Sequence, residues 1–98
     1  MDADNTTTIT LYDPSGRIAE RHDGVPVALR GLDLALGAPM RRRIPLAELS
    51  SIFAEGDDLI LLSDGHRLEL ALGDAVARTW AEGLRSLVDA LAPEVSPP

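Results

Sequence analysis

The chain has 98 residues, a formal net charge of −7, a hydrophobic content of 45% and no cysteine. Its length suits one domain over residues 1–98, with an ordered core at about 6–92 between tails at 1–5 and 93–98. The absence of cysteine excludes disulfides and thiolate metal sites, and the acidic charge argues against nucleic acids or anionic membranes as general partners.

Short strands are predicted along the first part of the chain. Residues 6–12 are rich in β-branched side chains, which is typical of a strand. The Asp-Pro-Ser-Gly sequence at 13–16 predicts a turn. Residues 17–22 predict a polar second strand, which ends at a turn over the Asp-Gly pair at 23–24.

Leucines at every second position predict the third strand, over residues 27–36. Strict alternation favours a strand over a helix and places the leucines on one face. The Gly-Ala-Pro segment at 37–39 ends this strand, and residues 41–44 predict a short fourth strand that ends at Pro45. The alternating leucines are Leu32, Leu34 and Leu36.

The segment 46–54 fits two interpretations. The spacing of its first apolar residues fits a helical turn, whereas Ile52 and Ala54 alternate as in a strand. We expect a short strand over residues 50–54.

The clearest local pattern is a β-hairpin with arms at residues 58–63 and 66–72. Asp64-Gly65 between the arms is a strong two-residue turn sequence, because both positions need a positive φ. The second arm alternates between apolar and polar residues, but the first arm is apolar on both faces. A helix, a loop or another chain must cover its second face. We therefore expect a partner interface on the first arm, at Leu59, Ile60, Leu61 and Leu62.

A C-terminal helix is predicted from Asp74, a favourable N-cap residue, to a stop at Pro93. Its apolar residues recur at spacings of three and four, so one face of the helix packs on the core. The apolar stripe comprises Val76, Trp80, Leu84, Leu87, Val88 and Leu91. Opposite charges four residues apart predict two ion pairs on the exposed side, Arg78–Glu82 and Arg85–Asp89.

These elements predict a mainly β fold with one C-terminal α-helix, in which about seven short antiparallel strands are capped by the amphipathic helix. The segment 43–91 resembles the C-terminal half of a pleckstrin-homology-like domain, where a hairpin with an Asp-Gly turn leads into a helix with a tryptophan followed by leucines. The matching residues are Asp64, Gly65, Trp80, Leu84 and Leu87. The resemblance implies a bent barrel plugged by the helix, and peptide binding by strand addition between a sheet edge and the helix. An open sheet with the helix across one face is the structural alternative.

The only basic run is Arg41, Arg42 and Arg43. On a strand, Arg41 and Arg43 would share one face and could bind a small anion or a phosphorylated headgroup. The competing interpretation is a solvated edge strand whose charges discourage pairing with other strands.

The other polar residues predict no metal, cofactor or catalytic site. His22 and His66 lie in different predicted turns, and Asp-Gly turns account for the aspartates beside them. Asp57 and Asp58 are adjacent, so on a strand they would point to opposite faces. Trp80 lies on the apolar stripe and is expected to pack in the core. We therefore predict that the protein is not an enzyme and needs no cofactor.

The ends of the chain and its basic residues suggest where the protein works. The N-terminal sequence MDADNTTT has no apolar run, and no segment approaches the ~20 apolar residues of a membrane span, so a cytoplasmic location is expected. All nine basic residues are arginine, which fits a GC-rich, bacterial genome. The predicted function is a non-enzymatic protein-interaction or adaptor module. Its partner is another protein, which it could inhibit, or a second copy of the chain. The alternative is anion binding through the strand at Arg41–Arg43.

Overall fold

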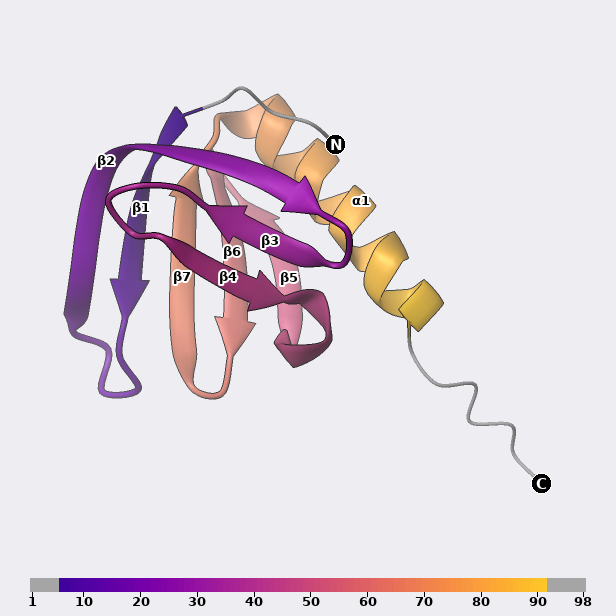
Figure 1. Ribbon diagram of the computed structural model, residues 1–98, viewed down its shortest axis with the longest axis horizontal. Helices are drawn as coiled ribbons and strands as arrows, with labels where there is room; N and C mark the ends of the chain where they lie inside the picture. Colours follow the sequence, from indigo (N-terminus) through magenta and orange to yellow (C-terminus); the bar gives the residue numbers. More distant parts are fainter. Residues whose placement is uncertain (1–5, 92–98) are drawn as a thin grey trace.

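Within residues 6–91, the part of the chain that the computed structural model describes, seven strands and a short 3₁₀-helix precede one α-helix (Figure 1). The predicted mainly β fold with a C-terminal helix is therefore confirmed. The predicted tails and the helix stop at Pro93 lie outside the described residues. The elements are β1 (Thr6–Tyr12), β2 (Ile18–Arg30), β3 (Asp33–Leu36), β4 (Arg42–Pro45), η1 (Leu46–Glu48), β5 (Ser51–Glu55), β6 (Asp58–Ser63), β7 (His66–Ala71) and α1 (Asp74–Leu91).

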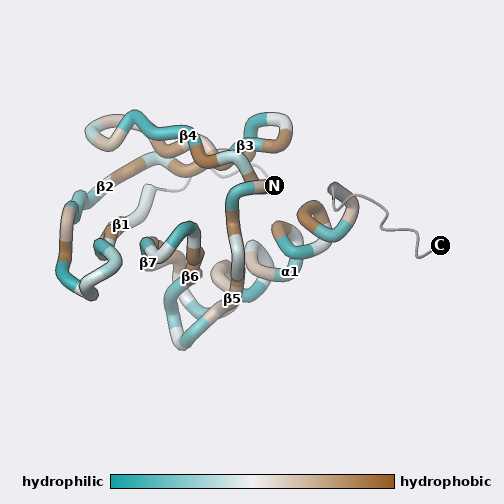
Figure 2. Tube along the Cα trace, turned by 90° about the horizontal axis from the view of Figure 1, so that it is seen from below, coloured by the Kyte–Doolittle hydropathy of each residue, from teal (hydrophilic) through white to brown (hydrophobic). Residues whose placement is uncertain are grey.

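The strands form one curled antiparallel sheet in the order β4-β3-β2-β1-β7-β6-β5. Pairing of β1 with β7 joins the two halves of the sheet, with Ile9 opposite Leu70. Seen from below, the part with β3 and β4 lies over the part with β7, β6 and β5, and α1 lies on the side of β5 (Figure 2). In the described chain β4 and β5 are the two ends of the sheet, so no strand pairing closes the curl on that side.

One buried apolar cluster fills the curl, and α1 supplies its cover on the open side. Trp80 is 4% exposed and Leu84 is fully buried, so the predicted core position of Trp80 is confirmed. Ala77 and Ala81 lie beside them on α1, and their small side chains let the helix approach the sheet closely. The sheet contributes Ile9, Leu11, Val25, Val27, Leu34, Leu36, Ile52, Leu59, Leu61, Leu68 and Leu70 to this cluster.

The predicted turn at 23–24 is wrong, because the chain continues through it as the single strand β2. Thr7 pairs with Val25 and Ile9 pairs with His22, so β2 holds one extra residue at this point. Gly24 has a φ of 67°, the left-handed conformation that glycine adopts readily in a β-bulge. The bulge bends β2, which lets its first part pair with β1 and its last part pair with β3.

The predicted strand over 27–36 is also divided. Gly31 and Leu32 form a two-residue loop between β2 and β3, and Gly31 has a φ of 61°. Leu32 is therefore 49% exposed and does not face inward, whereas Leu34 and Leu36 are buried as predicted.

The remaining strand predictions agree closely with the structure. The β6–β7 hairpin turns at Asp64 and Gly65, whose φ angles are 54° and 83°. Both interpretations of the segment 46–54 hold in part, because η1 forms at Leu46–Glu48 and β5 follows at Ser51–Glu55.

Candidate functional site

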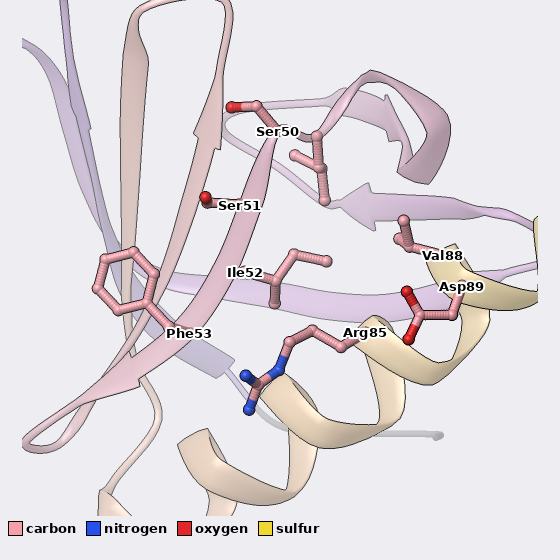
Figure 3. A pocket seen from close by; sticks show the side chains of 8 residues that line it. Ser50, Ser51, Ile52, Phe53, Arg85, Val88 and Asp89 are labelled. Atoms are coloured by element: carbon pink, nitrogen blue, oxygen red, sulfur yellow. The ribbon is translucent and has the colours of Figure 1, made fainter. Parts of the chain in front are cut away.

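A groove runs between β5 and α1 along the open side of the sheet (Figure 3). One part, of about 430 Å³, lies between residues 49–53 and the α1 residues Arg85, Val88 and Asp89. A second part, of about 300 Å³, lies between Phe53 and Ala54 on one wall and α1 on the other. Phe53 and Arg85 border both parts, so the groove is continuous along the strand.

The groove lies along an open hydrogen-bonding edge of β5. The two-residue turn at 56–57 makes β5–β6 a tight hairpin, so the residue pair beside the turn is hydrogen-bonded. Hydrogen-bonded and non-bonded pairs alternate in an antiparallel ladder, so Phe53 bonds to β6. Ile52 and Ala54 direct their N–H and C=O groups away from β6, to the edge where the described chain has no neighbouring strand.

The two faces of β5 differ. On the inner face Ile52 is 6% exposed and packs in the core under α1. Phe53 points to the outer face and is half-buried (Figure 3). The middle of β5, from Ile52 to Ala54, carries no charge, in contrast to the other end strand, β4, which carries two arginines. Apart from Glu55 at its end, β5 therefore presents no charged side chain that discourages strand pairing, whereas β4 presents two.

The α1 wall of the groove carries exposed charges of alternating sign, Arg78, Glu82, Arg85 and Asp89. The predicted pairs Arg78–Glu82 and Arg85–Asp89 are wrong. The Arg78 guanidinium instead lies 3.3 Å from the Asp74 carboxylate, and Arg85 Nε donates to the Ala81 carbonyl at 3.4 Å. None of these groove residues is predicted as a site residue from the sequence. The alternating charges on α1 are the only local feature of the sequence that indicates a site here.

The predicted partner interface on β6 is wrong, because most of its side chains are buried within the chain itself. Leu59, Ile60 and Leu61 are at most 1% exposed within the chain itself, and Leu62 alone is half-buried. Leu59 and Leu61 face the core, whereas Ile60 faces the outer side between Phe53 and Glu69.

Arg67 supplies the cover that the second face of β6 needs. Its guanidinium lies 2.8 Å from Glu69 on β7 and 3.8 Å from Glu55 on β5. Since β6 lies between those strands, the side chain crosses β6 at Ile60. The long apolar stem of arginine can bury a neighbour while its head stays hydrated.

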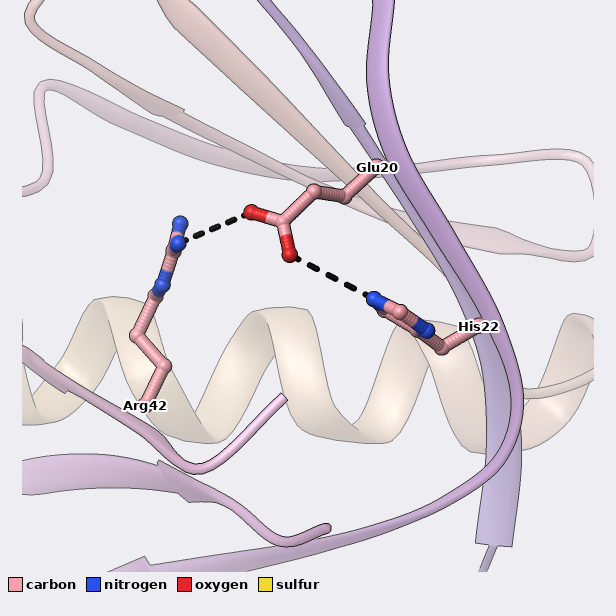
Figure 4. Close-up of polar contacts among 3 residues, drawn as sticks. All are labelled: Glu20, His22 and Arg42. Atoms are coloured by element: carbon pink, nitrogen blue, oxygen red, sulfur yellow. Dashed lines mark hydrogen bonds and ion pairs between the residues drawn. The ribbon is translucent and has the colours of Figure 1, made fainter. Parts of the chain in front are cut away.

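The structure separates the three arginines predicted to bind an anion. Arg41 precedes β4 with a φ of 47°, so it does not share a strand face with Arg43. The Arg42 guanidinium lies 2.9 Å from the Glu20 carboxylate, which also lies 3.3 Å from His22 Nε2 (Figure 4). Arg43 lies 3.9 Å from Asp33. Two of the three charges therefore have acidic neighbours.

The histidines and paired aspartates do not assemble a metal-binding cluster within residues 6–91. His22 contacts Glu20, whereas His66 borders a separate hollow with Arg42, Arg43 and Ile44. Burial, with the nearby charges of Glu69 and Asp57, raises the pKa of the Asp58 carboxyl. Hydrogen bonds from Ser15 and from the Arg17 backbone lower the pKa of the Asp13 carboxyl in the first turn.

No helix within residues 6–91 is both long enough and apolar enough to cross a membrane. Comparison of the chain with protein-family models, with curated proteins and with solved structures finds no match.

Proposed function

We propose that the chain is a non-enzymatic protein-interaction module that binds another polypeptide strand along the β5 edge, in the groove beside α1. The observation that carries this proposal is the open edge at Ile52 and Ala54. In strand addition, main-chain hydrogen bonds supply affinity, and pockets for alternate side chains supply specificity. The β5 groove offers both features in one place.

The walls define the bound segment. It is extended, and its inward side chains lie near Ala54 and Ala81, where there is room for small apolar groups. Its polar groups meet Arg85 and Asp89 on α1. The resemblance of residues 43–91 to pleckstrin-homology-like domains adds support, since domains of that type often bind a peptide between a sheet edge and the helix.

Anion binding through Arg41, Arg42 and Arg43 has weaker support. An anion would compete with the Glu20 carboxylate for Arg42 and with the Asp33 carboxylate for Arg43. It would gain no paired cationic face, because Arg41 lies outside β4.

The test uses a random extended-peptide library displayed on phage, selected on the intact chain. Ala54→Pro removes the outward N–H without removing a bond to β6, and proline is tolerated at such edge positions. Ala54→Ser keeps the N–H and is the matched control. We expect selected peptides to bind the wild type and Ala54→Ser, to lose binding to Ala54→Pro, and to shift the amide NMR signals of residues 51–55. Peptides that bind Ala54→Pro equally well, or shift signals only elsewhere, would refute the proposal.

A further inference from the structure

We infer that the strand that adds to β5 is β5 of a second copy of this chain, in a two-fold symmetric dimer with the α1 helices side by side. This inference rests on the proposed function, because it fills the same edge with a specified partner. Two patterns carry it, one on α1 and one on β5. Both have the same centre.

The α1 charges are self-complementary under a two-fold axis. Along the groove the order is Arg78, Glu82, Arg85 and Asp89, that is, plus, minus, plus, minus. A two-fold axis reverses the order in the second copy. Arg78 then faces Asp89 of the other copy, and Glu82 faces Arg85. Every charge of this row meets an opposite charge, although the chain as a whole has a net charge of −7 and would otherwise repel itself.

The β5 edge fits the same axis. Ile52 and Ala54, whose N–H and C=O groups point to the open edge, lie on either side of Phe53. An antiparallel pairing centred on Phe53 places Ile52 opposite Ala54 of the second copy, and each pair exchanges its N–H and C=O bonds. Phe53 then meets its own counterpart as a non-hydrogen-bonded pair on the outer face, where cross-strand side chains come closest.

The two centres coincide along the groove. The charge pattern is centred between Glu82 and Arg85, and Phe53 borders the groove together with both of these residues. One axis therefore satisfies the strand pairing and the charge pairing at once. A C2 interface requires such a self-complementary patch.

The experiment exploits the predicted contact between Glu82 and Arg85 of the other copy. Sedimentation velocity over a wide concentration range should give a wild-type species of twice the 10.5 kDa chain mass. Arg85→Glu and Glu82→Arg each place like charges in contact, so each variant alone should stay monomeric. Mixed in equal amounts, the two variants should form a heterodimer, because their charges are then complementary. The double variant should dimerise alone.

Two further measurements complete the test. Circular dichroism melting should show that each single variant is folded, and Ala54→Pro should be monomeric where Ala54→Ser is dimeric. A monomeric wild type, or single variants that self-associate as well as the wild type, would overturn the inference. Peptide binding that depends on the Ala54 N–H would still support the proposed function in that case. If that binding is also absent, both proposals fail.

Discussion

Arg67 on β7 and Glu55 on β5 form a 3.8 Å ion pair across the intervening strand β6. The guanidinium therefore lies over Ile60, which is 1% exposed although it faces away from the core. The apolar residues on both faces of β6, which predict a partner interface, are thus covered within one chain by an arginine of the neighbouring strand.

Removing this cover should destabilise the fold. Arg67→Ala exposes Ile60 and should lower the free energy of unfolding by about 1 kcal/mol, mostly through lost packing, since exposed ion pairs contribute little. Arg67→Met keeps an apolar stem over Ile60 and should lose less. Urea denaturation measures both. An equal loss in the two variants would show that the charge, and not the cover, is what stabilises.

The sequence predicts well those features that a few adjacent residues determine. Asp64-Gly65 fixes its hairpin because the two residues adopt a positive φ, and the α1 stripe follows from helical spacing alone. The predicted strand over 27–36 failed because Gly31 and Leu32 also suit a two-residue loop, and leucine alternation does not reveal which choice is made.

The candidate site could not be predicted because it depends on which strand ends the sheet. The residues Ser51–Glu55 do not themselves indicate that β5 lies at the end of the sheet. Its position there depends on the pairing of β1 with β7, two strands that are far apart in the sequence. The predicted Arg41 and Arg43 face failed for a local reason, the left-handed backbone at Arg41. The sequence pattern predicts a strand at 41–44, but it does not determine that β4 begins at Arg42.

Trp80 should be the most costly residue of α1 to truncate. It is 4% exposed and packs in the cluster that closes the curl. Trp80→Ala should cost about 3–5 kcal/mol, a large part of the ~5–15 kcal/mol typical of a whole domain. The exposed Ser86→Ala on the same helix should change stability by no more than about 0.5 kcal/mol. Chemical denaturation measures both variants, with tryptophan fluorescence as the probe for Ser86→Ala and circular dichroism as the probe for Trp80→Ala. Similar losses in the free energy of unfolding would contradict the packing assigned to Trp80.

Asp58 gives the fold a pH dependence of known sign. Its pKa is raised above the ordinary value of 3.8, chiefly by burial, so the fold favours the neutral carboxyl. The favourable contribution is complete below 3.8 and is lost as the pH rises through the raised value. Asp58→Asn should therefore raise the free energy of unfolding at neutral pH and leave it unchanged in acid below 3.8. A gain that persists in acid would point to a cause other than ionisation.

Amide hydrogen exchange can test the β5 edge directly, without any substitution. Phe53 N–H bonds to β6, whereas the N–H groups of Ile52 and Ala54 point to the open edge. In dilute solution, Ile52 and Ala54 should exchange fast and Phe53 slowly. At high concentration, or with a selected peptide, the two fast amides should become protected while the protection of Phe53 stays the same. If all three amides are slow at every dilution, the edge is covered within the single chain, and strand addition at β5 is ruled out.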